Sequence, residues 1–596
     1  MRIPIDHHVL LSDQKSLALL DPFGSVVWLC APRPDAPPVF GSLLDDDAGV
    51  FSIVPLDGKR LGQSYDGDTM ICRTSYQGID VVDFLDVTCA EGTRLVRRIQ
   101  GKGTVLLRFA PRLDFGAVAT RFTADEHGLH IDGGLPAADG APCPITLTSS
   151  APIAFEFDDD GTHHEVSAAI DVDGVVVLEL LIGADVADDD EVTRRRTTAR
   201  FWAQWVKQLQ LPDVEHGALR DVIARSALVL KALVYAPTGA MVAAATTSLP
   251  ETFGGLRNWD YRYCWPRDAS FAAATLARLG DTDVGVQLLR WIADRSADLH
   301  RTGAGAGILE PLYAVTGEPL DGEVLRDDVK GYGGSQPVRV GNGAAGQVQL
   351  DAFGPVVELA ATLHDAGVDL DDDLVDFVET LLQAIADGWD RPGHGVWELR
   401  ARERSHVYSR GMCWWALTRG SEVLAARDVD VDAFRSAAHA IQNQTAAEGF
   451  FDAKQAYTMA YGEPDLDAAV LKLIGSGFFG DVDKERSTVA AIADELQAGP
   501  TVFRYLMDDG LEGEEGGFFL CAFWLADALA RTGDVDIARR LFVDVVKQAG
   551  PLGLMAEEHD PRPGTVCKTL GNFPQAYSHL GLLDSAMLLA RLETAQ

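Results

Sequence analysis

The chain has 596 residues, a formal net charge of -38, and 47% hydrophobic against 23% charged residues. A chain this acidic repels phosphate backbones and anionic lipid surfaces, so we exclude nucleic acid and membranes as expected partners. No signal-like segment and no run of ~18 apolar residues is present, and the eight cysteines form no C-x-x-C pair. We therefore expect a cytoplasmic protein of more than one domain, with a neutral ligand as its partner.

The first 190 residues have the pattern of a β-domain. Short apolar runs at Ser25–Cys30, Val105–Phe109, Ile153–Phe157 and Val175–Leu181 are separated by Gly, Asp and Pro clusters. Many short strands with turn signals are typical of antiparallel sandwiches. We predict an N-terminal antiparallel β-sandwich over residues 1–190.

A basic helical linker is expected at residues 191–215, and from residue 216 to 596 the apolar spacing changes to a period of 3.6. Apolar spacing and Gly/Pro breaks predict twelve helices. Their expected starts are near Ala218, Ala269, Thr282, Leu350, Asp371, Val407, Val431, Leu466, Glu485, Gly517, Val535 and Gln575.

The connections between the predicted helices alternate in length. The turns after the second, fourth, sixth and tenth helices are short, whereas those after the odd-numbered helices are long. Short connections join antiparallel neighbours in helical folds. This alternation predicts an (α/α)6 barrel whose long loops gather at one end, where a site is expected.

The first long loop, WDYRYCWPRD at residues 259–268, combines aromatic and charged side chains. Aromatic rings stack on the apolar faces of a sugar, and Arg and Asp bind its hydroxyls through charge-assisted hydrogen bonds. The structural alternative is a buried aromatic loop with Asp268 as an N-cap. We predict that this loop contacts a sugar.

Two glutamates in later loops are candidates for general acid–base catalysis. Glu398 follows Trp397, and an apolar setting would raise its pKa as a general acid requires. Glu557 lies in the loop of the opposite helix pair, so the two should face each other across the barrel mouth. That arrangement suits an inverting glycosidase, with carboxyls roughly 6.5–9.5 Å apart and room for a water.

These segments resemble glycoside hydrolase family 15, which includes glucoamylases, glucodextranases and a group of trehalases. The resemblance runs from about Thr247 to His579 through WDYRYCWPRD, GSQPVRVGN, GVWELR, GEEGGFFLCAFW and AEEHDP…GNFPQAYSH. The N-terminal part also resembles the trehalase-like β-domain, at Leu17–Cys30 and Pro38–Pro55.

The resemblance implies a role for each matching residue. Glu398 would be the general acid and Glu557 the general base. Arg267 and Asp268 would grip the non-reducing glucose. The other implied substrate contacts are Tyr261 beside the nucleophilic water, Trp265, Arg504 between the two central subsites, and Tyr577. From their places in the loops, Trp397 beside Glu398 and Glu514 at the same barrel end are further candidate substrate contacts.

The implied activity is inverting, exo-acting hydrolysis of a small α-glucoside, with no cofactor and no metal. Leu399 replaces the acidic residue that follows the general acid in fungal glucoamylases, and no starch-binding domain is expected, so trehalose is the leading substrate. A glucoamylase-like or isomaltose-type activity is the main alternative. Disaccharide phosphorylases and non-catalytic sugar sensors are remote alternatives. The sequence leaves open whether Glu514 or Glu515 replaces Glu557 as base, and whether the chain forms a homo-oligomer.

Overall fold

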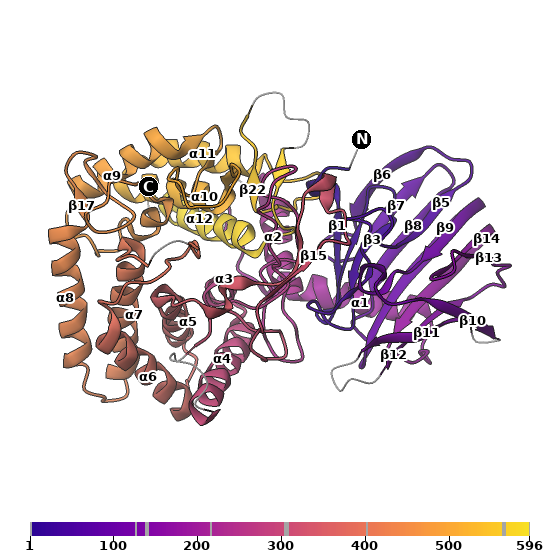
Figure 1. The fold of residues 1–596 in the computed structure, drawn as a ribbon, viewed down its shortest axis with the longest axis horizontal. Helices are drawn as coiled ribbons and strands as arrows, with labels where there is room; N and C mark the ends of the chain where they lie inside the picture. Colours follow the sequence, from indigo (N-terminus) through magenta and orange to yellow (C-terminus); the bar gives the residue numbers. More distant parts are fainter. Residues whose placement is uncertain are drawn as a thin grey trace.

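The computed structural model describes residues 3–125, 128–136, 142–214, 217–302, 309–400, 403–562 and 568–594. Figure 1 shows two parts side by side, with strands from the N-terminal third of the chain and helices from the remainder. Within the described ranges, no helix combines the length and apolarity needed to cross a membrane.

The β-part is an antiparallel sandwich whose two layers share two long strands. β9 (Thr93–Ala110) pairs with β14 (His164–Ile182) along its whole length. One half of β9 pairs with β8 (Ile79–Leu85) and the other half with β5 (Val50–Pro55), so both layers extend from the same pair of strands. The other strands are β1 Val9–Ser12, β2 Leu17–Leu20, β3 Val26–Cys30, β4 Pro38–Phe40, β6 Arg60–Tyr65, β7 Cys72–Tyr76, β10 Arg121–Asp125, β11 Gly128–Pro136, β12 Pro142–Ser149 and β13 Glu156–Asp159.

Alternating burial along these strands places the β-core between the layers. On β14, Val166, Ala168, Ile170 and Val172 are buried while the residues between them are exposed, as the period of two requires. Three of the four predicted runs lie in β3, β9 and β14. The fourth, β13, begins later than predicted and continues past Phe157, because pairing with β14 runs from Glu156 to Asp159.

The helical part is the predicted (α/α)6 barrel. Its inner ring closes because each member packs against the next. Inner helices such as α10 are buried on nearly every side and are therefore apolar all round. The ring consists of α3 Pro266–Arg278, α5 Phe353–Asp365, α7 Val407–Ala425, the 3-10 helix η7 Ala468–Leu473, α10 Phe519–Thr532 and α12 Ala576–Thr594.

Six outer helices surround this ring (Figure 1). They are amphipathic; on α6, for example, Leu374, Val378 and Leu381 are buried and the Asp371 carboxylate caps the N-terminus through Leu374 N at 3.1 Å. The outer helices are α2 Arg220–Ala232, α4 Thr282–Thr302, α6 Asp372–Gly388, α8 Asp432–Glu448, α9 Val482–Leu496 and α11 Val535–Val546.

The alternation of short and long connections is confirmed. Inner helices lead to outer ones through short turns, such as residues 279–281 and 533–534, and outer helices lead back through long loops. Those loops carry short strands: β15 Glu323–Arg326, β16 Val338–Gly341, β17 Phe450–Phe451, β18 Ala456–Tyr457, β19 Gln497–Ala498, β20 Thr501–Val502, β21 Gly517–Phe518, β22 Glu558–His559 and β23 Thr569–Leu570.

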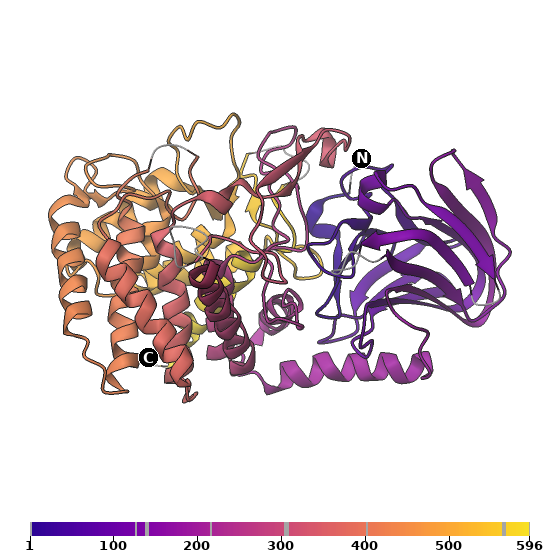
Figure 2. The same ribbon diagram turned by 60° about the horizontal axis from the view of Figure 1, so that its bottom comes forward.

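One further helix connects the two parts. α1 (Glu191–Gln208) runs from the β-part to the barrel, as Figure 2 shows. The Asp190 carboxylate caps it through Thr193 N at 2.8 Å. The two parts also meet directly, because the Trp28 indole donates to the backbone oxygen of Ala245 at 2.8 Å.

Candidate active site

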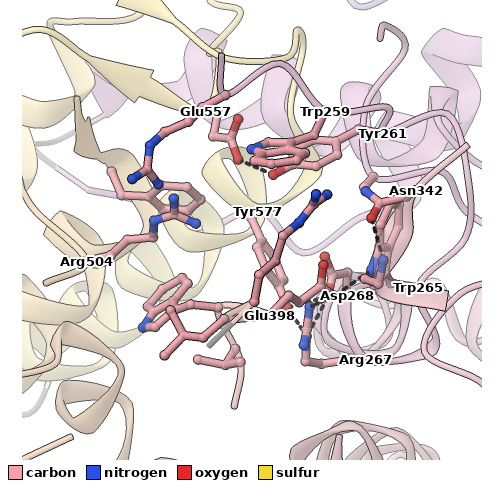
Figure 3. A pocket seen from close by; sticks show the side chains of 18 of the residues that line it. Trp259, Tyr261, Trp265, Arg267, Asp268, Asn342, Glu398, Arg504, Glu557 and Tyr577 are labelled. Atoms are coloured by element: carbon pink, nitrogen blue, oxygen red, sulfur yellow. Dashed lines mark hydrogen bonds and ion pairs between the residues drawn. The ribbon is translucent and has the colours of Figure 1, made fainter. Parts of the chain in front are cut away.

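A pocket opens at the barrel end that carries the long loops. Aromatic, arginine and carboxylate side chains line this pocket together, as is typical of small-ligand sites. It is lined by nine of the ten residues proposed from the sequence: Tyr261, Trp265, Arg267, Asp268, Trp397, Glu398, Arg504, Glu557 and Tyr577. Figure 3 shows Glu557 and Tyr261 on one side, with Glu398, Arg267 and Asp268 on the other.

One wall of the pocket is built on the first turns of α3 and α12. Arg267 donates from Nε to Asp268 at 2.8 Å and to the Tyr577 hydroxyl at 3.2 Å. Tyr577 in turn donates to Asp268 at 2.6 Å. All three side chains are buried. Such a fixed array of donors and acceptors suits recognition of sugar hydroxyls.

Glu398 lies in the loop between α6 and α7, with a backbone φ of +57°. A non-glycine residue in this left-handed region is strained, and such strain is concentrated at functional sites. Its Oε1 accepts hydrogen bonds from Trp265 Nε1 at 2.8 Å, Gln349 Nε2 at 3.0 Å and Arg267 Nη2 at 3.4 Å. Because all three donors reach Oε1, a proton on this carboxyl belongs on Oε2. Burial raises the pKa of Glu398, and the Arg267 charge opposes that rise.

Glu557 precedes β22 in the loop between α11 and α12 and is 1% exposed. Tyr261 donates its hydroxyl to Glu557 Oε1 at 2.7 Å. The second oxygen, Oε2, is buried and makes no hydrogen bond of normal geometry with the described residues. Burial raises the pKa of Glu557 to about 7, although the hydrogen bond from Tyr261 and the charge of Arg504 favour the ionised form.

Gly571 lies directly against Glu557. Its backbone φ is +74°, and an added Cβ would lie 2.4 Å from Glu557 Oε2 and 2.6 Å from Glu557 Cβ. Only glycine leaves space for the carboxylate in this position.

Three further carboxylates lie behind Glu557. Oxygen atoms of Glu251, Glu515 and Glu558 lie within 4.8 Å of one another, a spacing that a metal ion could use. However, Arg504 donates from Nε to Glu515 at 2.9 Å and from Nη2 to Glu251 at 3.4 Å. Arg257 also pairs with Glu515. These guanidinium groups already supply positive charge, so we assign the cluster as an ion-pair network that holds Arg504.

Trp397 is held in place by an aspartate from the inner ring. Its indole Nε1 donates to Asp467 Oδ1 at 2.7 Å, and the same oxygen caps η7 through Ala469 N at 2.8 Å. The Arg504 guanidinium lies 5.5 Å from the Trp397 ring centroid. Burial raises the pKa of Asp467 to about 6. Asp467 and Arg504 therefore hold the side chain of Trp397, the residue that precedes Glu398, in place.

The structure places Glu514 outside this pocket. Its side chain is 82% exposed and pairs with Arg562 at 3.3 Å. Its neighbour Glu515 points inward to Arg257 and Arg504 instead. The expectation that Glu514 contacts sugar in the pocket thus finds no support, because Glu514 turns towards solvent where Glu515 turns inward.

Sequence reasoning missed several residues of the site. Trp259 and Asn342 line the pocket and lie in motifs quoted above, but no role was assigned to either. Gln349, which donates to Glu398, had no signal in the sequence. The same holds for Asp351, which is fully buried and lies 3.4 Å from Arg267. Partners of this kind become recognisable only when the fold brings distant segments together.

Comparison with known proteins shows the family. The model of glycosyl hydrolases family 15 matches residues 217–587, and that of the trehalase-like N-terminal domain matches residues 1–205. A trehalase of Mycobacterium tuberculosis is 34% identical, with 99% of this chain and 90% of that protein covered. A trehalase of Thermoplasma acidophilum is 32% identical, with 94% and 96% covered.

Among solved structures, a bacterial glucoamylase complexed with acarbose superposes with a TM-score of 0.73 at 12% identity, covering 99% of this chain and 94% of that one. This likeness shows that both the β-part and the barrel share its fold. The family match over most of the barrel, together with full-length relatives above 30% identity, shows that the chain belongs to glycosyl hydrolases family 15 and is a glycoside hydrolase.

Proposed function

We propose that the protein hydrolyses α,α-trehalose with inversion, using Glu398 as general acid and Glu557 as general base. The observation that carries this proposal is the placement of two carboxyls with different partners in one pocket, which Arg267 and Asp268 also line. Trehalases aligned over nearly the whole chain support the choice of substrate.

The hydrogen bonds around Glu398 support its role as acid. With Oε1 saturated by three donors, the proton carried on Oε2 is the one available for the glycosidic oxygen. Burial keeps this carboxyl protonated at higher pH than usual. Such a raised pKa is what a general acid near neutral pH needs.

The hydrogen bonds around Glu557 support its role as base. A phenol hydroxyl donating to Oε1 stabilises the carboxylate form, and Arg504 adds a favourable charge. A backbone hydrogen bond from Asn572 also favours the ionised form, which is the form that accepts a proton from water.

These roles define a single displacement. Glu398 gives its proton to the glycosidic oxygen as the C1–O bond breaks. A water attacks C1 from the opposite face and transfers a proton to Glu557, and the transition state resembles an oxocarbenium ion. The products are β-glucose from the attacked ring and glucose of unchanged anomeric form from the leaving ring.

Short α-1,4- and α-1,6-gluco-oligosaccharides are the alternative substrates. Proton NMR of the purified protein with trehalose, followed at early times, tests both substrate and stereochemistry. Equal initial amounts of α- and β-glucose are expected. Release of only α-glucose would refute inversion, whereas turnover of maltose or isomaltose without turnover of trehalose would overturn the substrate alone.

The two roles are tested separately by amide substitution. Glu398→Gln and Glu557→Gln are each expected to lower kcat by roughly 10²- to 10⁴-fold, the range that general acid–base groups contribute. Glu379→Gln, on the exposed face of α6, is the matched control with unchanged kcat. A Glu557→Gln enzyme of near-native kcat would show that another group activates the water.

A further inference from the structure

One arginine of the pocket differs from the others in its exposure. Arg400 follows Glu398 by two residues and lines the same pocket, and its side chain is 40% exposed. The side chains of Arg257, Arg267 and Arg504 are exposed by only 7%, 5% and 10%. Arg400 therefore lies at the open side of the pocket and the other three in its walls.

Arg400 also has N–H donors that are not used within the described part of the chain. The guanidinium of Arg257 is occupied by Asp509, Glu515 and the backbone oxygen of Leu511. In the described part of the chain, the one hydrogen bond of Arg400 runs from Nη2 to Glu323 at 3.1 Å. Its Nε and Nη1 are thus left with donors for a ligand.

A stacked support holds Arg400 in place. Its Cζ lies 4.6 Å from the centroid of the Trp259 ring, and the Cζ of Arg339 lies 4.5 Å from the same centroid. The Glu323 carboxylate joins both arginines, at 2.9 Å to Arg339 and 3.1 Å to Arg400. A guanidinium that stacks by its face keeps its N–H donors in the plane of the group, where they can reach hydroxyls.

The leaving sugar must lie on the same side of Glu398 as Arg400. In the function proposed above, the non-reducing ring lies against the buried side chains of Arg267 and Asp268, and Glu398 donates to the oxygen between the two rings. The second ring therefore extends towards the mouth, where Arg400 is exposed. The neighbouring Leu399 is 3% exposed, has no polar side-chain atoms and packs against Met459 and Tyr505.

We propose that Arg400, held on Trp259 by Glu323, hydrogen-bonds the hydroxyls of the leaving sugar and thereby determines which leaving group the enzyme accepts. This inference rests on the function proposed above. It assigns to Arg400 the contact beyond the cleaved bond that Leu399 cannot make.

The test compares two leaving groups. Trehalose releases a sugar, whereas α-glucosyl fluoride releases fluoride and places no sugar at the mouth. Arg400→Ala is expected to lower kcat/KM for trehalose by roughly 10- to 100-fold, as loss of a charge-assisted hydrogen bond implies. For α-glucosyl fluoride the loss should be at least tenfold smaller. Glu323→Gln, which loosens Arg400, should have a weaker effect in the same direction.

Two controls keep the outcomes distinct. Arg400→Lys retains the charge and reports whether the planar fork is needed, and Arg290→Ala removes a half-exposed arginine that pairs with Asp371 away from the pocket. Equal losses on both substrates, or no loss on either, would overturn the proposal. If the wild type cleaves α-glucosyl fluoride but not trehalose, the substrate assignment fails, and the comparison is made with whichever of maltose or isomaltose is cleaved.

Discussion

Gly571→Ala should damage catalysis although Gly571 itself takes no part in the proposed reaction. The new Cβ would lie 2.4 Å from Oε2 and 2.6 Å from Cβ of Glu557, whereas carbon contacts settle at about 3.5–4.0 Å. Glu557 must therefore move by about 1 Å, and a misplacement of that size can cost about 10²-fold in rate. Because an L-residue with a φ of +74° is strained, the substitution should also lower the unfolding free energy by about 1–2 kcal/mol.

Rate and stability must be measured together to separate these two effects. Gly367→Ala is the matched control, because Gly367 has a φ of +82° and nothing within 4 Å of the added Cβ. Both variants should lose similar stability from backbone strain in urea unfolding. Only Gly571→Ala should lose kcat, measured with a saturating α-glucoside. If its kcat stays within threefold of the wild type, Gly571 does not position the base.

Three further predictions concern charge. The kcat/KM of the wild type should fall as pH drops through about 7, because Glu557 must be ionised to act as the proposed base. The pH dependence of stability has the opposite sign: because folding raises the pKa of Glu557, its contribution to the unfolding free energy should be lost as pH rises through about 7. Tyr261→Phe should move this acidic limb to higher pH, since it removes the hydrogen bond that favours the carboxylate; an unmoved limb would contradict the role given to Tyr261. Asp83→Leu should lower the unfolding free energy by about 3–5 kcal/mol in urea titration, because it leaves the fully buried Arg97 without its ion-pair partner.

The barrel could be predicted from the sequence because its helices differ in burial and its connections differ in length. The start predicted near Leu466 nevertheless leads to a short 3-10 helix, η7, where an α-helix was expected. Its Asp467 cap serves Trp397 as well as the local backbone. The local pattern predicts a helical segment here. It does not show that the fourth member of the inner ring is a 3-10 helix whose cap, Asp467, contacts Trp397 in the loop of Glu398.

The site was predictable where motif and chemistry coincide, as at Arg267 and Asp268 in the first turn of α3. The sequence does not predict which of two adjacent residues of the same type faces the site. Glu514 and Glu515 differ only in which way each side chain turns, and the arginines that draw Glu515 inward come from different loops. Ion pairs between residues so far apart in sequence form only when the helical ring closes, so the spacing of residues along the chain does not predict them.

The β-part supports the reactive loop of the barrel directly. Asp260 and Arg262 form a buried ion pair at 2.7 Å, and Arg262 also donates to the backbone oxygen of Ala36 in the β-part at 2.9 Å. Asp260 Oδ2 accepts from Gly341 N at 3.2 Å, which ties in the loop of β16. Because Tyr261 lies between these two residues in sequence, their ion pair and its contact with the β-part help to position the hydroxyl that donates to Glu557. The β-part thus helps to orient the loop of Tyr261, which is a long connection between α2 and α3 without support from helix packing of its own.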